Sequence, residues 1–90
     1  MLDIILSNRF KRDLKLAAKR GYRLELLDEV VERLARQEEL APKFRDHELS
    51  GSYAGFRECH IQPDWLLVYR VENSELILFL SRTGTHSDLF

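Results

Sequence analysis

The side chains best suited to chemistry in this sequence are three histidines and one aspartate. His47, His60 and His86 all lie in the second half of the chain, each at the edge of an extended segment, and Asp64 follows four residues after His60. Imidazole has an unperturbed pKa of about 6.5, so histidine can accept a proton in one step and donate one in another near neutral pH. If the strands that carry these residues are neighbours in one sheet, the four side chains converge on one surface.

Such a set is sufficient to cleave an RNA phosphodiester without a metal ion. A base removes the proton from the ribose 2′-hydroxyl, a cation stabilises the charge that grows on the phosphate, and an acid protonates the departing 5′-oxygen. Arg82 is the candidate cation, because its planar guanidinium can donate two parallel hydrogen bonds to an anion. Trp65 and Phe90 offer flat faces on which a base can stack, an interaction worth about 1–3 kcal/mol per base.

Each of these residues also has a structural interpretation, and spacing alone does not decide between the two. A single histidine at a strand end is commonly a surface or core residue, and Asp64 directly after Pro63 is a common turn sequence. Trp65 opens an apolar segment and can pack in the core, while Phe90 can dock on the core or fray. Cys59 alternates with an apolar neighbour and is most simply a buried small hydrophobe. Two further arginines, Arg57 and Arg70, have a structural interpretation as surface ion-pair partners of Glu58, Glu72 or Glu75.

A metal site is an alternative use of three histidines and an aspartate. Zinc motifs commonly place two ligands close together in the sequence, as in H-x₃₋₅-H. Here the histidines are 13 and 26 residues apart, which gives no local signature. The sequence therefore predicts neither a metal ion nor another cofactor.

In the first half of the chain the apolar residues recur with the period of an α-helix. Residues 2–6 predict a short strand buried on both faces. Ser7 can cap the helix that follows, and Gly21 suits the left-handed backbone at which that helix ends. A second helix follows so closely that the two must form a helical hairpin. The apolar faces are Phe10, Leu14 and Ala17 in the first helix, and Leu24, Leu27, Val30, Val31 and Leu34 in the second.

After Pro42 the pattern changes to short extended segments. Strands are predicted at residues 43–49, 56–61, 65–71 and 75–81, separated by turns, and residues 83–85 break the pattern before a short tail that ends at Phe90. The order β-α-α-β-β-β-β indicates an α+β fold, in which a helical hairpin packs on one face of a mostly antiparallel sheet. The candidate site belongs on the opposite face.

Length and composition restrict the class of protein. Ninety residues make one domain, residues 1–90, because a second hydrophobic core would be too small. No apolar segment approaches the roughly 20 residues of a membrane span, and the N-terminus lacks the basic start and long apolar stretch of a signal peptide. One cysteine cannot form an internal disulfide. We therefore expect a cytoplasmic protein with no membrane partner.

The net charge of −1 conceals an uneven distribution of charge. Residues 1–23 hold seven basic and two acidic groups, a local net charge of +5. This excess is compatible with a surface that contacts RNA or an acidic partner, and also with an ordinary solvated helix face. The candidate RNA contacts in this segment are Arg9, Lys11, Arg12, Lys15 and Lys19.

Three segments carry a long, discontinuous pattern of uncommon residues. They read D-H-x-L-x-G from Asp46, G-x-R-x-x-H-x-x-P-D-W-x-L-x-Y from Gly55, and R-T-G-T-H-x-x-L-F from Arg82. This pattern resembles the YafQ family of the RelE/ParE toxin superfamily, and the β-α-α opening agrees with the RelE-like fold of that family.

The resemblance implies a ribosome-dependent endoribonuclease, the toxin of a toxin–antitoxin pair, which cleaves messenger RNA in the ribosomal A site. Its partners would be the ribosome with its 16S rRNA, the messenger and a cognate antitoxin that neutralises it. The catalytic residues implied are His47, His60, Asp64 and His86, with Trp65, Arg82 and Phe90 binding the substrate.

Within the catalytic set we expect His86 to act as the general acid and to share the proton transfers with Asp64, while the other two histidines orient groups or stabilise charge. Two alternatives remain from the sequence. One is a non-catalytic RelE-fold module that binds the ribosome or a protein, and the other is a metal-dependent hydrolase, which a chelator would inhibit.

Overall fold

Five strands form a single sheet in the computed structural model, which describes residues 1–90. The spatial order is β1-β5-β4-β3-β2, with β1 parallel to β5 and every other pair antiparallel. This confirms the predicted α+β fold. The elements are β1 (Asp3–Leu6), α1 (Asn8–Lys19), α2 (Leu24–Ala35), η1 (Pro42–Phe44), β2 (His47–Glu48), η2 (Gly51–Tyr53), β3 (Arg57–Gln62), β4 (Trp65–Glu72), β5 (Ile77–Gly84) and α3 (His86–Leu89).

The first helix of the hairpin begins and ends at the predicted residues. The Ser7 hydroxyl accepts a hydrogen bond from the Phe10 amide at 2.9 Å, which satisfies one of the free N–H groups of the first turn of α1. Gly21 follows the helix with φ of 78°, and the amide of Tyr22 donates to the carbonyl of Ala17. This is the hydrogen-bond pattern of a Schellman motif, which terminates the helix and turns the chain into α2.

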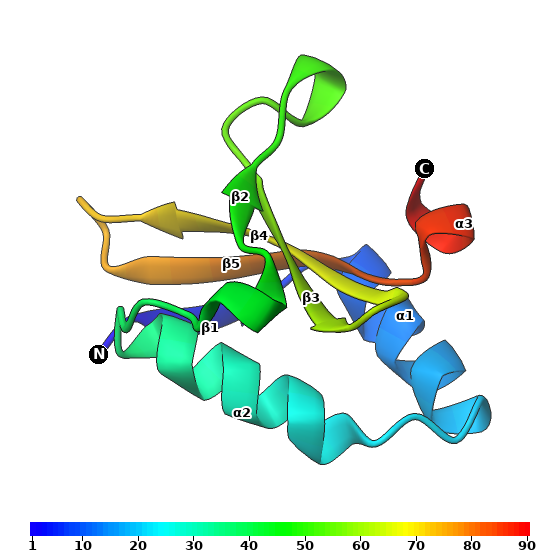
Figure 1. The fold of residues 1–90 in the computed structure, drawn as a ribbon. Helices are drawn as coiled ribbons and strands as arrows, with labels where there is room; N and C mark the ends of the chain where they lie inside the picture. Colours follow the sequence, from blue (N-terminus) through cyan, green and yellow to red (C-terminus); the bar gives the residue numbers. More distant parts are fainter.

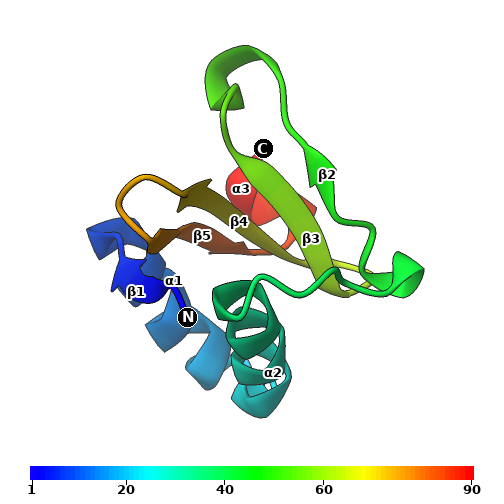
Figure 2. The ribbon, with the colours of Figure 1, turned by 90° about the vertical axis from the view of Figure 1, so that its left-hand side faces the viewer.

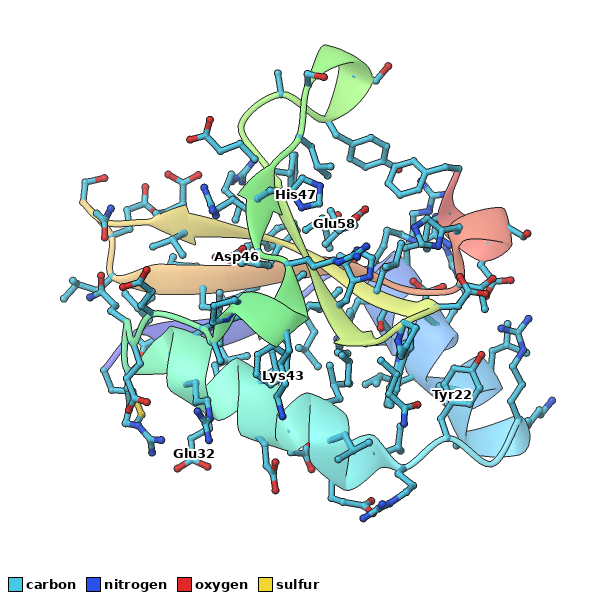
Figure 3. All side chains as sticks on the ribbon, in the orientation of Figure 1. Tyr22, Glu32, Lys43, Asp46, His47 and Glu58 are labelled. Carbon is cyan, nitrogen blue, oxygen red and sulfur yellow. The ribbon has the colours of Figure 1, made fainter.

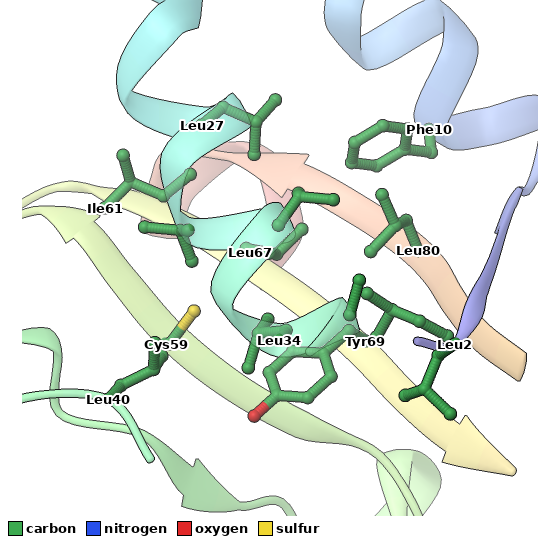
Figure 4. Packing of buried hydrophobic residues seen from close by; sticks show 14 of the residues in the cluster. Leu2, Phe10, Leu27, Leu34, Leu40, Cys59, Ile61, Leu67, Tyr69 and Leu80 are labelled. Atoms are coloured by element: carbon green, nitrogen blue, oxygen red, sulfur yellow. The ribbon is translucent and has the colours of Figure 1, made fainter. Parts of the chain in front are cut away.

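The main hydrophobic core lies between the helical hairpin and one face of the sheet (Figures 2 and 4). Strand residues alternate between the two faces, so every second side chain of β3, β4 and β5 meets α1 or α2. Burial of each large side chain contributes about 1.5–3 kcal/mol. Cys59 is fully buried here, as expected, and burial raises the pKa of its thiol. Members of this core include Leu2, Phe10, Leu27, Leu34, Leu40, Ile61, Leu67, Tyr69 and Leu80.

The opposite face of the sheet carries a smaller apolar cluster of three residues, Leu66, Val68 and Leu89. In Figures 1 and 2 the η2 loop and α3 stand on this side, away from α1 and α2. These two short segments cover only part of the face, which leaves the ends of β2, β3 and β5 open for a site.

Three local expectations from the sequence were wrong. Residues 2–6 are not buried on both faces: β1 is an edge strand paired only with β5, and Ile4 and Ile5 are 46% and 43% exposed. Residues 43–49 form a one-turn helix and a two-residue strand, because Arg45 between them adopts a left-handed backbone with φ of 49°. Residues 83 and 84 continue β5 through pairing with β4, and the tail forms α3.

None of the helices combines the length and the apolar character that a membrane span requires.

Candidate active site

The sheet register brings the predicted histidines together. His60 of β3 is paired with Leu66 of β4, which is paired with Gly84 of β5, so the start of α3 lies beside His60. The rings of His60 and His86 are 5.7 Å apart at an interplanar angle of 61°. His47 of β2 lies opposite Glu58 of β3, which brings the third histidine to the same face.

Asp64 and His86 form a hydrogen-bonded pair. One carboxylate oxygen, Oδ1 of Asp64, accepts from Nδ1 of His86 at 2.8 Å and from the His86 backbone N–H at 3.0 Å. These bonds, led by the backbone donor, lower the pKa of the Asp64 carboxyl. Because Nδ1 is engaged, the ring orientation is set and Nε2 is left to meet a substrate. Both side chains are more than half exposed, so an RNA strand can reach them.

A buried carboxylate that the sequence did not single out lies between the other two histidines. The Nε2 atoms of His47 and His60 are each 3.6 Å from Oε1 of Glu58, whose side chain is 7% exposed. Figure 3 labels His47 and Glu58. Nδ1 of His47 lies 2.7 Å from the carbonyl of Arg45, and Nδ1 of His60 lies 3.3 Å from that of Pro63. A carbonyl only accepts hydrogen bonds, so both Nδ1 atoms carry protons and both Nε2 atoms face the carboxylate.

Glu58 could have been found from its spacing. It precedes His60 by two residues in a predicted strand, and residues two apart share one face. A carboxylate beside a histidine on the same strand face is therefore a candidate member of the site, whatever its neighbours along the chain.

A second hydrogen-bonded group fixes the approach to β2. Oδ1 of Asp46 accepts from the Tyr69 hydroxyl at 2.5 Å and from Nε of Arg57 at 3.3 Å. Burial, and then the bond to Asp46, raise the pKa of Tyr69. Since Asp46 directly precedes His47, these bonds position that histidine. Arg57 thus pairs with Asp46 and Glu48 and not with any of the three glutamates expected from the sequence, whereas Arg70 pairs with Glu72 as expected.

Trp65 does not provide the stacking surface that was expected of it. Its side chain is 2% exposed, its ring packs on Tyr22 at 4.9 Å, and its indole N–H donates to Oγ1 of Thr83 at 2.9 Å. Trp65 is the first residue of β4 and points to the helical side of the sheet, opposite to the histidines. Its core interpretation is confirmed, and it acts on the site only through the packing beneath it.

Arg82 is paired within the protein and is not a free cation. Its Nε and one terminal nitrogen donate to the two carboxylate oxygens of Asp13 at 2.8 and 3.2 Å, and both side chains are 12% exposed. The Asp13 carboxylate also accepts the backbone N–H of Thr83 at 3.1 Å, so the pair ties α1 to the edge of β5. The hydrogen bonds to Asp13 raise the pKa of Arg82. Two of its five N–H donors are therefore already used, and the Asp13 carboxylate offsets its positive charge.

Phe90 stands at the rim of the site as an exposed aromatic side chain. It is 60% exposed, and its ring packs edge-on against Tyr53 of η2 at a centroid distance of 5.4 Å. Its backbone N–H donates to the carbonyl of His86 at 2.9 Å, so this end of the chain is ordered by α3. Phe90 thus offers a flat surface, and Tyr53 is an aromatic neighbour that the sequence did not identify.

The short helix α3, which begins with His86, is held by a capping box and an ion pair. Thr85 accepts from the Asp88 amide, and Oδ2 of Asp88 accepts from the Thr85 amide. Arg20 donates two hydrogen bonds to Asp88, at 2.6 and 3.1 Å. A Cβ at Gly84 would lie 2.9 Å from Oδ2 of Asp88, so this approach requires glycine. Asp88 thus links the helical hairpin to the helix that presents His86.

This arrangement predicts acid sensitivity of α3. The bond from Arg20, and then that from Thr85, lower the pKa of Asp88. The resulting stability is complete above the unfolded-state pKa of about 3.9 and is lost as the pH falls below it toward the folded-state value. We expect Asp88→Asn to be less stable than wild type at pH 7, by about 1 kcal/mol, and to lose less stability between pH 5 and 3. Urea unfolding at both pH values measures this.

The matched control is Ser87→Ala, an exposed neighbour in the same helix whose side chain makes no hydrogen bond. It should retain the wild-type dependence on pH. Equal acid sensitivity of wild type and Asp88→Asn would show that this carboxylate does not hold α3.

The basic residues of α1 form an exposed surface. Arg9, Lys11, Arg12, Lys15 and Lys19 are all exposed and form no ion pair with a carboxylate. Their positive charge is therefore not neutralised within the protein, as docking on RNA requires.

The fold also assembles a group of potential metal ligands. Glu58, His60 and His86 each place a ligand atom within 4.8 Å of the others. The prediction that no metal binds was based on the spacing of the histidines in the sequence. The sheet register instead brings together potential ligands from β3 and α3, which are distant in the sequence. Imidazole and carboxylate suit zinc or copper, so a transition metal ion would meet the same atoms that are available for proton transfer.

The fold and the site together define a class: a small α+β protein with an open set of histidines and carboxylates suited to proton transfer on an extended substrate. Comparison with known proteins agrees. Residues 2–90 match the family described as the bacterial toxin of type II toxin–antitoxin system, YafQ. The chain is 37% identical to the mRNA interferase toxin YafQ of Escherichia coli K12, over 98% of this chain and 95% of that protein.

Solved structures are similar over the whole chain. A metal-bound toxin from Helicobacter pylori superposes with a TM-score of 0.95 at 51% identity, and a copper-bound mutant toxin from that organism with 0.94 at 42%, each covering 100% of both chains. YafQ in the Escherichia coli DinJ–YafQ complex superposes with 0.89 at 36% identity, covering 100% and 99%. The chain belongs to the YafQ family of toxins of type II toxin–antitoxin systems.

Proposed function

We propose that this protein cleaves messenger RNA in the ribosomal A site by metal-independent acid–base catalysis, and that a cognate antitoxin neutralises it. It is an endoribonuclease by family and by its identity to an mRNA interferase over nearly its whole length. The observation that carries the mechanism is the Asp64–His86 pair, which engages Nδ1 and leaves Nε2 of this half-exposed ring without a partner beside the ring of His60.

The reaction needs two proton transfers and no redox step. A base takes the proton of the ribose 2′-hydroxyl, the 2′-oxygen bonds to phosphorus, and the bond from phosphorus to the 5′-oxygen breaks. An acid donates a proton to that oxygen, which leaves a cyclic phosphate on one product and a hydroxyl on the other. Each transfer contributes about 10²–10⁴-fold to the rate.

The geometry favours His86 as the acid. When its Nε2 is protonated the ring is cationic, and the Asp64 carboxylate on Nδ1 stabilises that charge. Asp64 therefore orients and supports His86, a narrower role than the shared proton transfer expected from the sequence. The base comes from the group of His47, Glu58 and His60, in which one carboxylate oxygen faces two imidazole nitrogens.

The phosphate is expected to be stabilised by protonated histidine, because Arg82 is bound to Asp13. A base of the messenger can stack on the exposed ring of Phe90, which Tyr53 supports from the side. Trp65 supports the strand from below and does not contact the substrate.

The proposed partners follow from the family and from the distribution of charge. One relative of known structure, YafQ of Escherichia coli, is seen in a toxin–antitoxin complex with DinJ, and we expect this chain to bind an antitoxin of its own. The exposed basic face of α1 is the proposed contact with 16S rRNA in the cytoplasm. Binding that depends on phosphate contacts weakens steeply as salt rises, so a salt titration of ribosome binding tests that face.

The test of the function is messenger cleavage on programmed ribosomes, beside the same messenger free in solution. We expect cleavage in the A-site codon on ribosomes and none of the free RNA. Cleavage of free RNA would remove the ribosome from the mechanism. If folded protein binds ribosomes without cutting, the non-catalytic binding module is the correct alternative.

Metal ions are predicted to inhibit the reaction, although the relatives from Helicobacter pylori are described as metal-bound and copper-bound. A Zn²⁺ or Cu²⁺ ion on Glu58, His60 and His86 would occupy the nitrogen lone pairs that carry the protons. We expect cleavage to fall as Zn²⁺ is added and to recover when the excess metal is chelated. Calorimetry should show weaker Zn²⁺ binding by Glu58→Gln. Loss of cleavage after chelation, with ribosomes kept intact, would instead support a metal-dependent hydrolase.

A further inference from the structure

A groove of about 660 Å³ lies between α2, η1 and the end of β3. Its apolar lining includes Leu26, Val30 and Phe44, and His60 forms part of its wall. The groove therefore borders the candidate active site, because it is lined by His60, whose ring lies 5.7 Å from that of His86.

The groove carries an excess of positive charge, and its cations form no ion pair with a carboxylate. Arg33, Lys43 and Arg45 line it, each is exposed, and none forms an ion pair, whereas Glu29 is its one acidic side chain. Lys43 extends beside α2 in Figure 3, with its Nζ 5.1 Å from the centroid of the Phe44 ring.

The unpaired cations of the groove differ from most other arginines of the protein, which form ion pairs. Every other arginine outside α1 is within 4 Å of a carboxylate: Arg20, Arg23, Arg36, Arg57, Arg70 and Arg82. The unpaired lysines and arginines thus fall into two groups, the basic face of α1 and this groove.

We propose that the groove binds the segment of the messenger that adjoins the cleaved phosphate. This proposal rests on the proposed ribonuclease function. The cations contact successive phosphates, and the apolar lining meets the bases. Single-stranded RNA combines a charged backbone with flat apolar bases, which matches a groove with an apolar floor and unpaired cations. Its continuity with His60 favours the substrate strand over ribosomal RNA.

Crosslinking identifies the occupant without depending on cleavage. Ribosomes are programmed with messengers that carry 4-thiouridine at single positions within and beside the A-site codon, and the His86→Gln protein is bound and irradiated. We expect crosslinks from positions on one side of the cleaved bond to peptides that contain residues 26–33 or 41–45. Crosslinks confined to 16S rRNA, or to α1, would overturn the proposal even if wild-type protein cleaves normally.

Charge removal gives a second, kinetic measurement. Arg33→Gln/Lys43→Gln is compared with Arg23→Gln/Arg36→Gln, which removes the same charge from the two ends of α2 outside the groove. The groove variant should raise KM about 5- to 20-fold with kcat unchanged, and the dependence of log affinity on log salt should become shallower by about 1.4. The control should match wild type. Unchanged KM with weaker inhibition by the antitoxin would assign the groove to a protein partner and overturn the proposal.

Discussion

Cleavage of the messenger on programmed ribosomes should be lost in His86→Gln, with a fall in kcat of about 10²–10⁴-fold. Glutamine keeps a hydrogen-bond donor near Asp64 but cannot carry and release a proton near neutral pH. The side chain is 56% exposed and is no part of either apolar cluster, so the variant should fold normally. Single-turnover cleavage with excess protein measures the chemical step separately from ribosome binding.

The pH profile separates a catalytic from a structural effect. If His86 is the acid, the limb of the wild-type profile that reports its deprotonation should be absent from the residual activity of His86→Gln. Asp64→Asn should retain that limb at a lower rate, because the imidazole remains but loses its carboxylate partner. A His86→Gln variant that keeps both limbs would remove this residue from the proton transfers.

Trp65→Ala is expected to destabilise the fold by about 3–5 kcal/mol, the usual cost of deleting a buried large aromatic side chain. The ring is 2% exposed and contacts Tyr22, so its removal leaves a cavity beneath β4. It also leaves Oγ1 of Thr83 without its indole donor. For a domain of this size the melting temperature should fall by roughly 4–8 °C for each kcal/mol. Thermal and urea unfolding, monitored by circular dichroism, measure the loss.

Trp65→Phe distinguishes packing from substrate binding. It keeps most of the buried ring and loses the hydrogen bond to Thr83, so it should cost roughly 1–3 kcal/mol and remain folded. Since the ring faces away from the histidines, cleavage by the folded variant should be near wild type. A stable Trp65→Phe protein with wild-type ribosome binding and greatly reduced kcat would restore a direct role for the indole.

Where the determinants are local, the elements could be predicted closely. The caps of α1 at Ser7 and Gly21, and the apolar faces of both helices, depend on residues within about one helical turn of each other. The predicted order of strands and helices also held, because short connections leave few topologies. The convergence of the histidines followed from that topology once the strands were taken as neighbours.

The errors lie where the structure depends on register. A shift of one residue in strand register moves every side chain of a strand to the other face of the sheet. The register of β4 therefore decides whether Trp65 points to the helices or to the solvent. The group of potential metal ligands, which includes Glu58, likewise forms only because the fold brings β3 beside α3. The partner of Arg82 is Asp13, 69 residues away in sequence, and no local pattern relates them.

By itself, the sequence determined the helical hairpin, the α+β order and the residues equipped for proton transfer, because side-chain type and periodicity act over short distances. Only the tertiary structure decided which of these residues face each other, which arginines remain unpaired and where a groove lies beside His60. Those properties depend on contacts between strands and helices that are distant in the chain, and such contacts are selected by the packing of the whole core.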